Sequence, residues 1–235
     1  MVRCPITLAL ACYLRSVSET FEGKEMTKVQ FSDQFMLEKS KLYAKYGEKL
    51  PRRTDAIELQ LDYPDCGWID MHFKVNGEEK VMISASDVYE PFEDIRYWLE
   101  QICGFNASNL RIYDEFDYYI LYYEPLELDP YNPYNNYHNG RLGLFYLYDC
   151  SVKQIVADGV FKTRKFVRSL YESILNYAKE SSKHDDFVEA WIEGAYNSEW
   201  GQYEDDNDPR VKEIFINKVT SPVVEYFLSG DNSTT

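Results

Sequence analysis

The sequence predicts an α+β domain, in which an antiparallel sheet of about six strands carries several helices packed mainly on one face. Several short segments alternate apolar and polar residues with the period of two that is typical of half-buried strands. Other segments repeat apolar residues at helical spacing, between residues that commonly start and end helices. The dipeptide Asn76-Gly77 joins two of the alternating segments and predicts a tight hairpin, which requires antiparallel strands.

A single α+β domain is expected at residues 26–235, because a chain of this length suits one domain and shows no linker. Residues 1–25 are left out of the fold prediction. An Ala-Leu-Ala motif before Cys12 is similar to a signal-peptide cleavage site, but it would release only eleven residues. A signal peptide has roughly 15–30 residues. Two interpretations stay open: a non-native or extended segment ahead of a functional start at Met26, or the remnant of a truncated export signal.

The first predicted helix begins after the capping residue Ser32 and continues to about Tyr46, where Gly47 ends it. Alternation then predicts three strands, at residues 57–63, 69–75 and 81–85. Because apolar and polar residues alternate along these strands, one face of their sheet is expected to contact water.

A second helix is expected to begin at Glu90-Pro91 and to end at Gly104, since proline suits the first turn of a helix and glycine its end. One stripe of this helix is apolar and is expected to pack on the sheet. The stripe consists of Phe92, Ile95, Leu99, Ile102 and Cys103.

A second hairpin is predicted from residues 110–113 and 118–123. The run Tyr118–Tyr123 is continuously apolar or aromatic, which predicts a central strand that is covered on both faces. Proline and asparagine then predict a loop at residues 124–140. Two more strands are expected at residues 142–148 and 152–156, before a turn at Asp158-Gly159.

The last third of the chain is predicted to be helical. One helix begins at the capping residue Thr163 and continues to about Lys179, and another starts near Ser182. A final helix opens at Asp208-Pro209 and restarts at Ser221-Pro222. The apolar face of the first of these helices consists of Phe166, Val167, Leu170, Ile174 and Ala178.

Two segments are locally basic, at residues 39–53 and 162–168. The first is interpreted as a solvated helix face that pairs with nearby acids. The second lies at a helix N-terminus, where positive charge opposes the helix dipole. Pairing with carboxylates of the sheet is the preferred explanation there, over a bound anion, because the chain holds 40 acidic residues.

Composition argues against several classes of function. A net charge of −15 disfavours binding to nucleic acid and to anionic membranes. No apolar run approaches the roughly 20 residues that span a bilayer. The five cysteines include no CxxC pair and fit the reduced thiols of a cytoplasmic protein.

Signatures of catalysis and metal binding are absent from the sequence. Its three histidines, His72, His138 and His184, do not lie at metal-ligand spacing. Motifs of nucleotide, phosphate and zinc-protease sites are missing, as is the serine-hydrolase motif. The acidic segment 204–208 lacks the central glycine and terminal glutamate of an EF-hand loop. We therefore expect no catalytic residue, no metal and no cofactor.

The segment Ile112–Tyr137 is the most distinctive part of the chain, with eight tyrosines, six carboxylates and no Lys or Arg. Core packing is the preferred explanation for the tyrosines of the strand itself. In the acidic flanks, tyrosine would supply rigid contact area and carboxylates would attract a basic partner. The predicted partner-binding residues are Asp114, Glu115, Asp117, Tyr119, Tyr123, Glu124, Asp129, Tyr131 and Tyr134.

The preferred function hypothesis is a non-enzymatic protein-binding module for a basic partner, such as a bacterial immunity protein that inhibits a cationic toxin or nuclease. The alternative is a small-ligand or glycan-binding protein, or a hydrolase, with a tyrosine-lined cleft and Glu124 or Asp129 as its acid. A third interpretation assigns the acidity to solubility alone. The sequence gives no indication of the oligomeric state.

Overall fold

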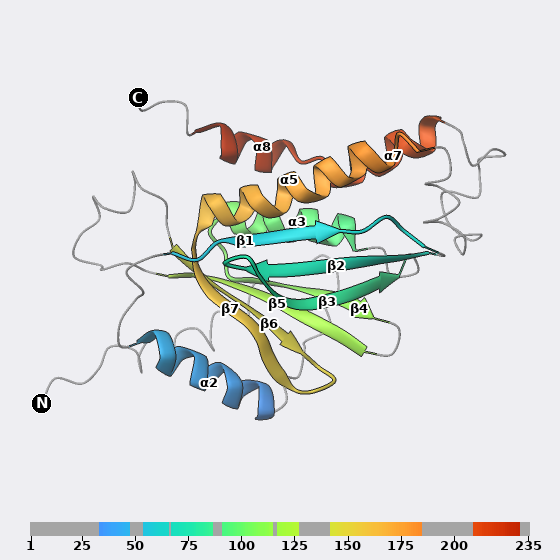
Figure 1. Cartoon of the computed structure of the whole chain (residues 1–235). Coiled ribbons are helices and arrows are strands. Elements are labelled where there is room, and N and C mark those ends of the chain that lie inside the picture. The colour runs from blue at the N-terminus through green and yellow to red at the C-terminus, as the bar shows by residue number, and fades with distance from the viewer. Residues whose placement is uncertain are drawn as a thin grey trace, which may run out of the picture. The chain divides into compact units, whose positions relative to one another are not determined.

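The computed structural model of the chain describes residues 33–47, 54–65, 67–86, 91–114, 117–126, 142–184 and 209–230. Within these ranges the chain forms seven strands and five helices, which confirms the predicted α+β class (Figure 1). The predicted helix after Ser182 and the acidic segment 204–208 lie outside the described ranges, as do residues 1–25 and most of the loop 124–140.

The strands form two antiparallel sheets. Sheet A has the order β1-β2-β3 and consists of β1 (Ile57–Leu61), β2 (Trp68–Val75) and β3 (Glu78–Ser86). Sheet B has the order β4-β5-β6-β7 and consists of β4 (Ser108–Asp114), β5 (Asp117–Leu126), β6 (Leu142–Asp149) and β7 (Gln154–Lys162).

The prediction of one six-stranded sheet is therefore wrong. Strands β3 and β4 lie close to each other but form no ladder, so the strands separate into groups of three and four. The chain between these two strands is the buried helix α3 (Phe92–Cys103). Alternation identifies strands and hairpins in a sequence, but it cannot show whether strands joined through a helix also pair with each other.

The Asn76-Gly77 hairpin is confirmed. Both residues have left-handed backbone angles, with φ of 55° and 79°, as a two-residue hairpin turn requires. Val75 pairs with Glu78 across the turn, and an irregularity in register follows at Phe73 and Lys74. The inward residues of β2 are buried, while the alternate residues are partly exposed, so this sheet has one polar face as predicted.

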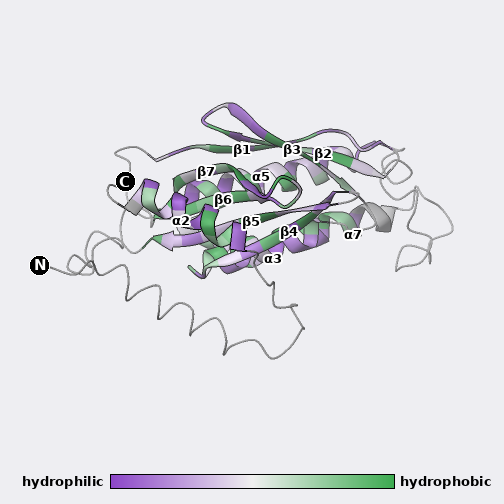
Figure 2. Cartoon of the chain, turned by 90° about the horizontal axis from the view of Figure 1, so that it is seen from below, coloured by the Kyte–Doolittle hydropathy of each residue, from purple (hydrophilic) through white to green (hydrophobic). Residues whose placement is uncertain are grey.

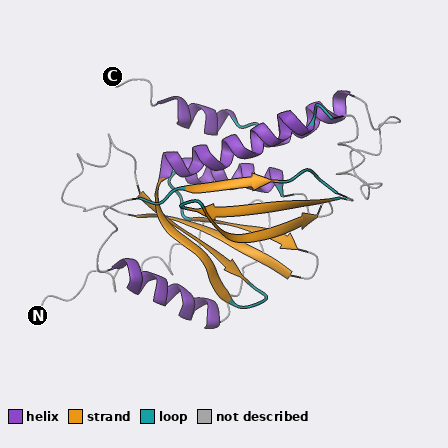
Figure 3. Cartoon of the chain, in the orientation of Figure 1, coloured by secondary structure: helices purple, strands orange, loops and turns teal. Residues whose placement is uncertain are grey.

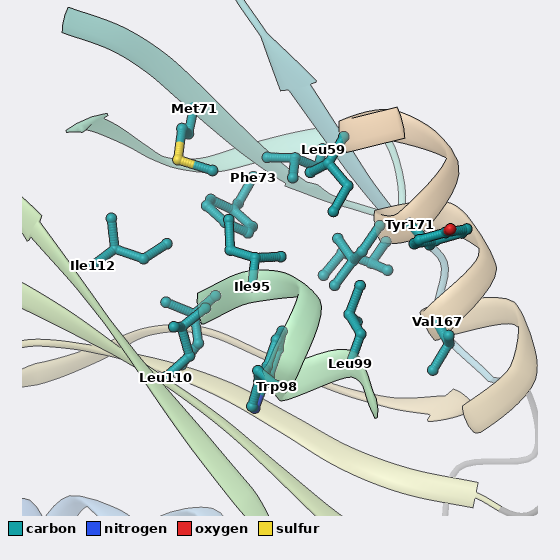
Figure 4. Close-up of a cluster of buried hydrophobic side chains, with 14 of the residues drawn as sticks. Leu59, Met71, Phe73, Ile95, Trp98, Leu99, Leu110, Ile112, Val167 and Tyr171 are labelled. Carbon is teal, nitrogen blue, oxygen red and sulfur yellow. The ribbon is translucent and has the colours of Figure 1, made fainter. Parts of the chain in front are cut away.

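One hydrophobic core joins the inner faces of both sheets to α3 and to α5 (Thr163–Ser181). Figure 4 shows Ile95, Trp98 and Leu99 of α3 between residues of the sheets, such as Met71 and Leu110, and residues of α5. Every residue of the stripes predicted for α3 and α5 is buried. The helices carry both hydrophobic and hydrophilic residues, as Figure 2 shows, and some large apolar side chains, such as Leu37 and Tyr226, are exposed.

Helices α7 (Pro209–Val219) and α8 (Pro222–Ser229) pack on α3 and α5. The predicted restart at Ser221-Pro222 is confirmed, because the fully buried Ser221 caps α8 by accepting a hydrogen bond from the amide of Val224. The hydroxyl of Ser221 also donates to Glu100 of α3 over 2.7 Å, which fixes the junction to the core.

Helix α2 (Asp33–Gly47) covers the outer face of sheet B, on the side opposite to the other four helices (Figure 3). Phe35 and Leu42 of α2 are buried against the aromatic face of the sheet. The ring of Phe35 lies 5.1 Å from the rings of both Tyr122 and Tyr148, between centroids. The middle of β5 is thus buried from both sides, as the run Tyr118–Tyr123 predicts.

The basic residues of α2 reach carboxylates of sheet B as well as those of their own helix. Lys39 forms an ion pair with the buried Glu124 of β5. Lys45 contacts Asp158 of β7 at 2.6 Å, while Lys41 pairs with its helix neighbour Glu38. Two lysines of the first basic segment, Lys39 and Lys45, therefore bind α2 to sheet B, while Lys41 belongs to the solvated face that was expected.

The second basic segment makes a different set of contacts. The guanidinium of Arg164 lies 5.1 Å from the ring centroid of Phe227 in α8. Arg168 donates to the carbonyl of Leu228 at 3.4 Å and lies 3.9 Å from Glu172 of its own helix. These contacts join the start of α5 to α8.

Two local predictions in this part of the chain are wrong. Asp158-Gly159 is not a turn, because β7 continues through both residues and pairs them with Tyr146 and Phe145. The turn lies earlier, at residues 150–153, where Lys153 has φ of 57°. Thr163 does not cap α5 either. It is the first residue of the helix, and its side-chain oxygen accepts a hydrogen bond of 2.6 Å from the hydroxyl of Tyr123.

No helix in the described ranges is both long enough and apolar enough to cross a membrane.

Candidate functional site

The candidate site is the end of the β4–β5 hairpin, called here the hairpin tip and defined as Tyr113, Asp114, Asp117, Tyr118 and Tyr119. The predicted hairpin is confirmed, and its last pairs place Tyr113 opposite Tyr118 and Asp114 opposite Asp117. All five residues are partly exposed. Two carboxylates thus face each other at the end of the hairpin, beyond a pair of facing tyrosines.

The two tyrosine rings of the tip are held by a neighbouring arginine. Their centroids lie 5.9 Å apart. The guanidinium of Arg111, from β4, lies 4.9 Å from the ring centroid of Tyr118 and donates to the hydroxyl of Tyr113 over 3.4 Å. A cation over an aromatic ring is attracted by the ring's quadrupole, so Arg111 restricts the orientation of both rings.

A third carboxylate, that of Asp149 on the next strand, lies beneath the tip and is only 9% exposed. Asp149 ends β6 and lies opposite Tyr119 of β5. Its Oδ1 atom accepts from the amide and the hydroxyl of Ser151, at 2.8 and 2.6 Å, and from the amide of Val152 at 3.2 Å. These bonds close the β6–β7 turn in the manner of an Asx turn, and they fix the carboxylate next to Tyr119.

The electrostatics of the tip follow from this gathering of acids. Burial raises the pKa of Tyr119 to about 12, together with the negative charges of Asp149, Asp114 and Asp117. A tyrosine hydroxyl loses its proton less readily near carboxylates, because the negative charge of the phenolate would be repelled by theirs. Burial is thus the first cause of the raised pKa of Tyr119, and three aspartates from three different strands add to it.

The thiol at this end of the sheet is not a reactive nucleophile. Burial raises the pKa of Cys150 to about 11, and the charges of Asp117 and Asp149 add to this effect. Because the thiolate is the nucleophilic form of cysteine, the thiol of Cys150 is protonated and unreactive at neutral pH.

Two of the predicted partner-binding residues lie in the interior. Tyr123 is fully buried, and its hydroxyl donates to Thr163. Glu124 is 9% exposed, is ion-paired with Lys39 and accepts a hydrogen bond of 3.1 Å from the hydroxyl of Tyr146. Both side chains are engaged in interactions within the fold, so neither residue is part of the hairpin tip.

The remaining predicted residues divide into two groups. Asp114, Asp117 and Tyr119 are brought together at the tip. Glu115, Asp129, Tyr131 and Tyr134 lie outside the described residues. Tyr113 and Tyr118 of the tip were not among the predicted partner-binding residues, and neither were their neighbours Asp149 and Arg111. Asp149 could have been found from the Asp-Cys-Ser sequence at a strand end, which is typical of an Asx turn, whereas nothing in the sequence near Arg111 indicates its contact with the rings.

The clefts of the described chain lie away from Glu124. One, of about 400 Å³, lies beside β7 and contains Tyr46, Asp55 and Asp158. Another, of about 510 Å³, lies between α3, α5 and α8 and contains Cys103 and Phe227. Glu124 lies under α2 instead, where Lys39 pairs with its carboxylate. Neither of these two clefts contains Glu124, and Asp129, the other acid of the alternative hypothesis, lies outside the described residues.

Metal coordination is equally unsupported within the described ranges, where no group of three or more His, Cys, Asp or Glu side chains is arranged to hold an ion. His72 lies between two carboxylates of sheet A, with Nδ1 at 3.0 Å from Glu79 and Nε2 at 3.2 Å from Asp62. Both ring nitrogens of His72 thus have a carboxylate as their hydrogen-bond partner.

Comparison of the chain with models of known protein families, with curated proteins and with solved structures found no match.

Proposed function

We propose that the chain is a non-enzymatic binding protein whose hairpin tip binds a basic surface of a partner protein. The observation that supports this proposal most directly is that the partly exposed Asp114 and Asp117 face each other near Tyr119, with the buried Asp149 opposite Tyr119. Like charges that lie directly opposite each other destabilise a strand pair. A cationic partner would remove this repulsion on binding, so the partner's charges would find a preformed complementary field.

The tyrosines of the tip support the same proposal. Tyr113 and Tyr118 lie beside the acids and are partly exposed, and Arg111 limits their motion. Tyrosine contributes large contact area at low conformational cost, which is why it is enriched at the centres of protein interfaces. Such rings, next to the carboxylates of Asp114 and Asp117, would combine fast, charge-directed encounter with a stable contact.

The concrete form that we propose is an immunity-type inhibitor of a basic toxin or nuclease, acting in the cytoplasm. An inhibitor of this kind must bind before its target acts, and electrostatic attraction raises association rates to about 10⁸ M⁻¹s⁻¹ at low salt. The overall charge of −15 supports such attraction over a long range.

The experiment is capture of the partner from a lysate of the source cells at two salt concentrations, roughly 50 and 300 mM. Interactions between exposed charges are weakly screened at the lower concentration and strongly screened at the higher one. Three forms of the protein are compared: the wild type, the tip variant D114N/E115Q/D117N and the control variant E58Q/D65N/E213Q. The control removes three exposed acids from outside sheet B.

The proposal predicts that the wild type and the control capture the same basic protein at low salt and hold less of it at high salt. The tip variant is expected to capture clearly less at both. Equal capture by all three forms would remove the hairpin tip from the account, and the absence of any basic partner would contradict the proposed function itself.

A further inference from the structure

The outer edge of β7 borders a polar cleft. β7 is the last strand of sheet B and pairs with β6 along one edge only (Figure 1). Beside its other edge lies the cleft of about 400 Å³, with Ile155–Asp158 of β7 along one side. The end of α2 forms a second wall through Lys45 and Tyr46, and the β2–β3 turn forms a third through residues 75–80.

The register shows which backbone groups of β7 point into this cleft. Val160 directs both of its groups away from β6, because its carbonyl accepts from the amide of Asp55 and its amide donates to Asp55 Oδ2, each over 2.8 Å. Asp158, two residues earlier, has the same orientation. Leu147 pairs with Ala157 and Tyr148 with Ile155, so Val156 has no partner on β6 and forms a β-bulge. Beyond this bulge, Ile155 is the next residue whose backbone amide and carbonyl point away from β6.

These outward groups are available for a further strand. None of the backbone hydrogen bonds among the described residues engages the outward groups of Ile155 or Asp158. At Val160 the edge already binds another segment, through one backbone hydrogen bond from the amide of Asp55 and one bond to the side chain of Asp55. A strand edge of this kind, beside a cleft with room for side chains, is the site used in β-strand addition.

We propose that this edge binds an extended segment of a partner chain, which adds to sheet B as a short fifth strand beside Gln154–Asp158. At about 3.3 Å per residue, the open edge would accommodate roughly four residues of the segment. The proposal is independent of the hairpin tip, since it involves the opposite edge strand of sheet B and a different set of side chains.

The chemistry of the cleft favours a polar segment with a basic side chain near Asp55. Of the three carboxylates that line the cleft, Asp158 is paired with Lys45 and Glu78 with Lys80, which leaves the charge of Asp55 without a lysine partner in the cleft. A second copy of this acidic chain would be a poor occupant, because pairing of two β7 edges would bring together two clefts with an excess of carboxylates on chains of charge −15. Proline is excluded at positions of the segment that face β7, since it has no amide hydrogen to donate.

The test uses the full chain and a displayed library of short linear peptides as the probe. Enriched peptides are synthesised, and hydrogen exchange at the amides of Ile155 and Asp158 is followed by NMR with and without each peptide. A bound strand is expected to slow exchange at both amides by at least about tenfold, because each becomes a donor in the ladder.

A second measurement examines the alternation that strand addition requires. In each peptide, backbone N-methylation of the residues that face β7 is expected to weaken binding by at least about tenfold, since each loses a hydrogen bond. Methylation of the alternate residues should change binding little. The tip variant D114N/E115Q/D117N should bind the peptides as the wild type does, which separates this proposal from the proposed function.

Three outcomes would overturn the proposal. The library yields no peptide that binds, or the peptides bind without protecting the two amides, or both sets of methylated peptides bind equally. Protection of Ile155 and Asp158 in the free protein, together with a dimer in light scattering, would also overturn it, because a second copy would then occupy the edge.

Discussion

Sheet B holds its acidic residues in two different ways. Under α2, Glu124 and Asp158 each contact a lysine, and each also accepts a hydrogen bond from a tyrosine. At the hairpin tip, Asp114 and Asp117 face each other across the hairpin, next to Asp149. The first arrangement pairs each carboxylate with a lysine, while the second places two partly exposed carboxylates opposite each other. Acidic residues of one sheet thus have different surroundings, and the difference predicts opposite effects on stability when they are removed.

The largest expected effect is at Lys39, the partner of the buried Glu124. Lys39→Ala should lower the free energy of unfolding by about 3 kcal/mol, because it leaves a carboxylate buried without its counter-ion. Urea denaturation measures this change. Lys41→Ala is the matched control, since its exposed pair with Glu38 contributes less than about 0.5 kcal/mol. If both variants lost the same stability, the ion pair would have no structural role.

A smaller loss is expected at Asp158, which accepts hydrogen bonds from Lys45 and from the hydroxyl of Tyr46. Asp158→Asn removes the charge but keeps an acceptor, and Lys45 is largely exposed, so the loss should be about 1 kcal/mol. Thermal and urea unfolding of this variant and of Asp65→Asn, an exposed aspartate in the turn before β2, would check it. A loss no larger than that of Asp65→Asn would show that the contacts of Asp158 with Lys45 and Tyr46 do not stabilise the fold.

The hairpin tip predicts a change of opposite sign. The variant D114N/D117N should gain roughly 0.5 kcal/mol of stability, because two facing like charges are removed from one strand pair. The amide side chain introduced by D117N keeps an oxygen to accept the amide hydrogen of Tyr118, as Asp117 does at 2.8 Å. A loss of stability in this variant would mean that the two aspartates are structural, and the contrast between the two groups of acids would fail.

The same variant, D114N/D117N, tests whether the charges of the two aspartates raise the pKa of Tyr119. Tyr119 has a pKa raised from its usual 10 to about 12, so its contribution to stability is complete below pH 10 and is lost as the pH rises from 10 to about 12. In D114N/D117N the pKa of Tyr119 should fall, because two of the three nearby charges are gone. NMR of labelled tyrosine rings would follow it, with Tyr119→Phe to assign the signal. An unchanged pKa would show that the charges of Asp114 and Asp117 do not contribute to it.

The smallest effect concerns a third acidic group, on sheet A. The pKa of His72 is raised above its usual 6.5, because hydrogen bonds with Asp62 and Glu79 outweigh the effect of burial. The resulting stability is complete below about pH 6.5 and is lost as the pH rises through the folded-state pKa. His72→Gln should abolish this dependence, which amounts to less than about 0.5 kcal/mol because both carboxylates are about half exposed. Parallel pH profiles of the two proteins would contradict it.

Much of the fold could be predicted from the sequence, where local periodicity and turn residues determine structure. The buried stripes of α3 and α5 and the Asn76-Gly77 turn are determined in this way. The division into two sheets and the path of β7 through Gly159 could not be predicted, because they depend on contacts between distant segments. At Gly159 the hydrogen bonds of Asp55 with Val160, more than 100 residues away in sequence, support the strand.

The candidate site was predicted only in part, for a similar reason. Asp114, Asp117 and Tyr119 lie in one hairpin, so their proximity follows from the register. Tyr123 and Glu124 belong to the same strand, but their side chains meet Thr163 and Lys39, which are distant in sequence. Composition alone could not distinguish an acid that binds a lysine of its own chain from one that faces another acid.

The measurement that tests the central claim most directly is the rate of association with the captured partner, followed by stopped flow over a series of salt concentrations. We expect the wild type to associate rapidly at low salt and to slow steeply as salt screens the charges. The tip variant D114N/E115Q/D117N should associate on the order of tenfold more slowly at low salt, with a flatter salt dependence, while E58Q/D65N/E213Q should follow the wild type closely. Identical rates and salt dependences for the wild type and the tip variant would contradict the claim that the hairpin tip binds the partner.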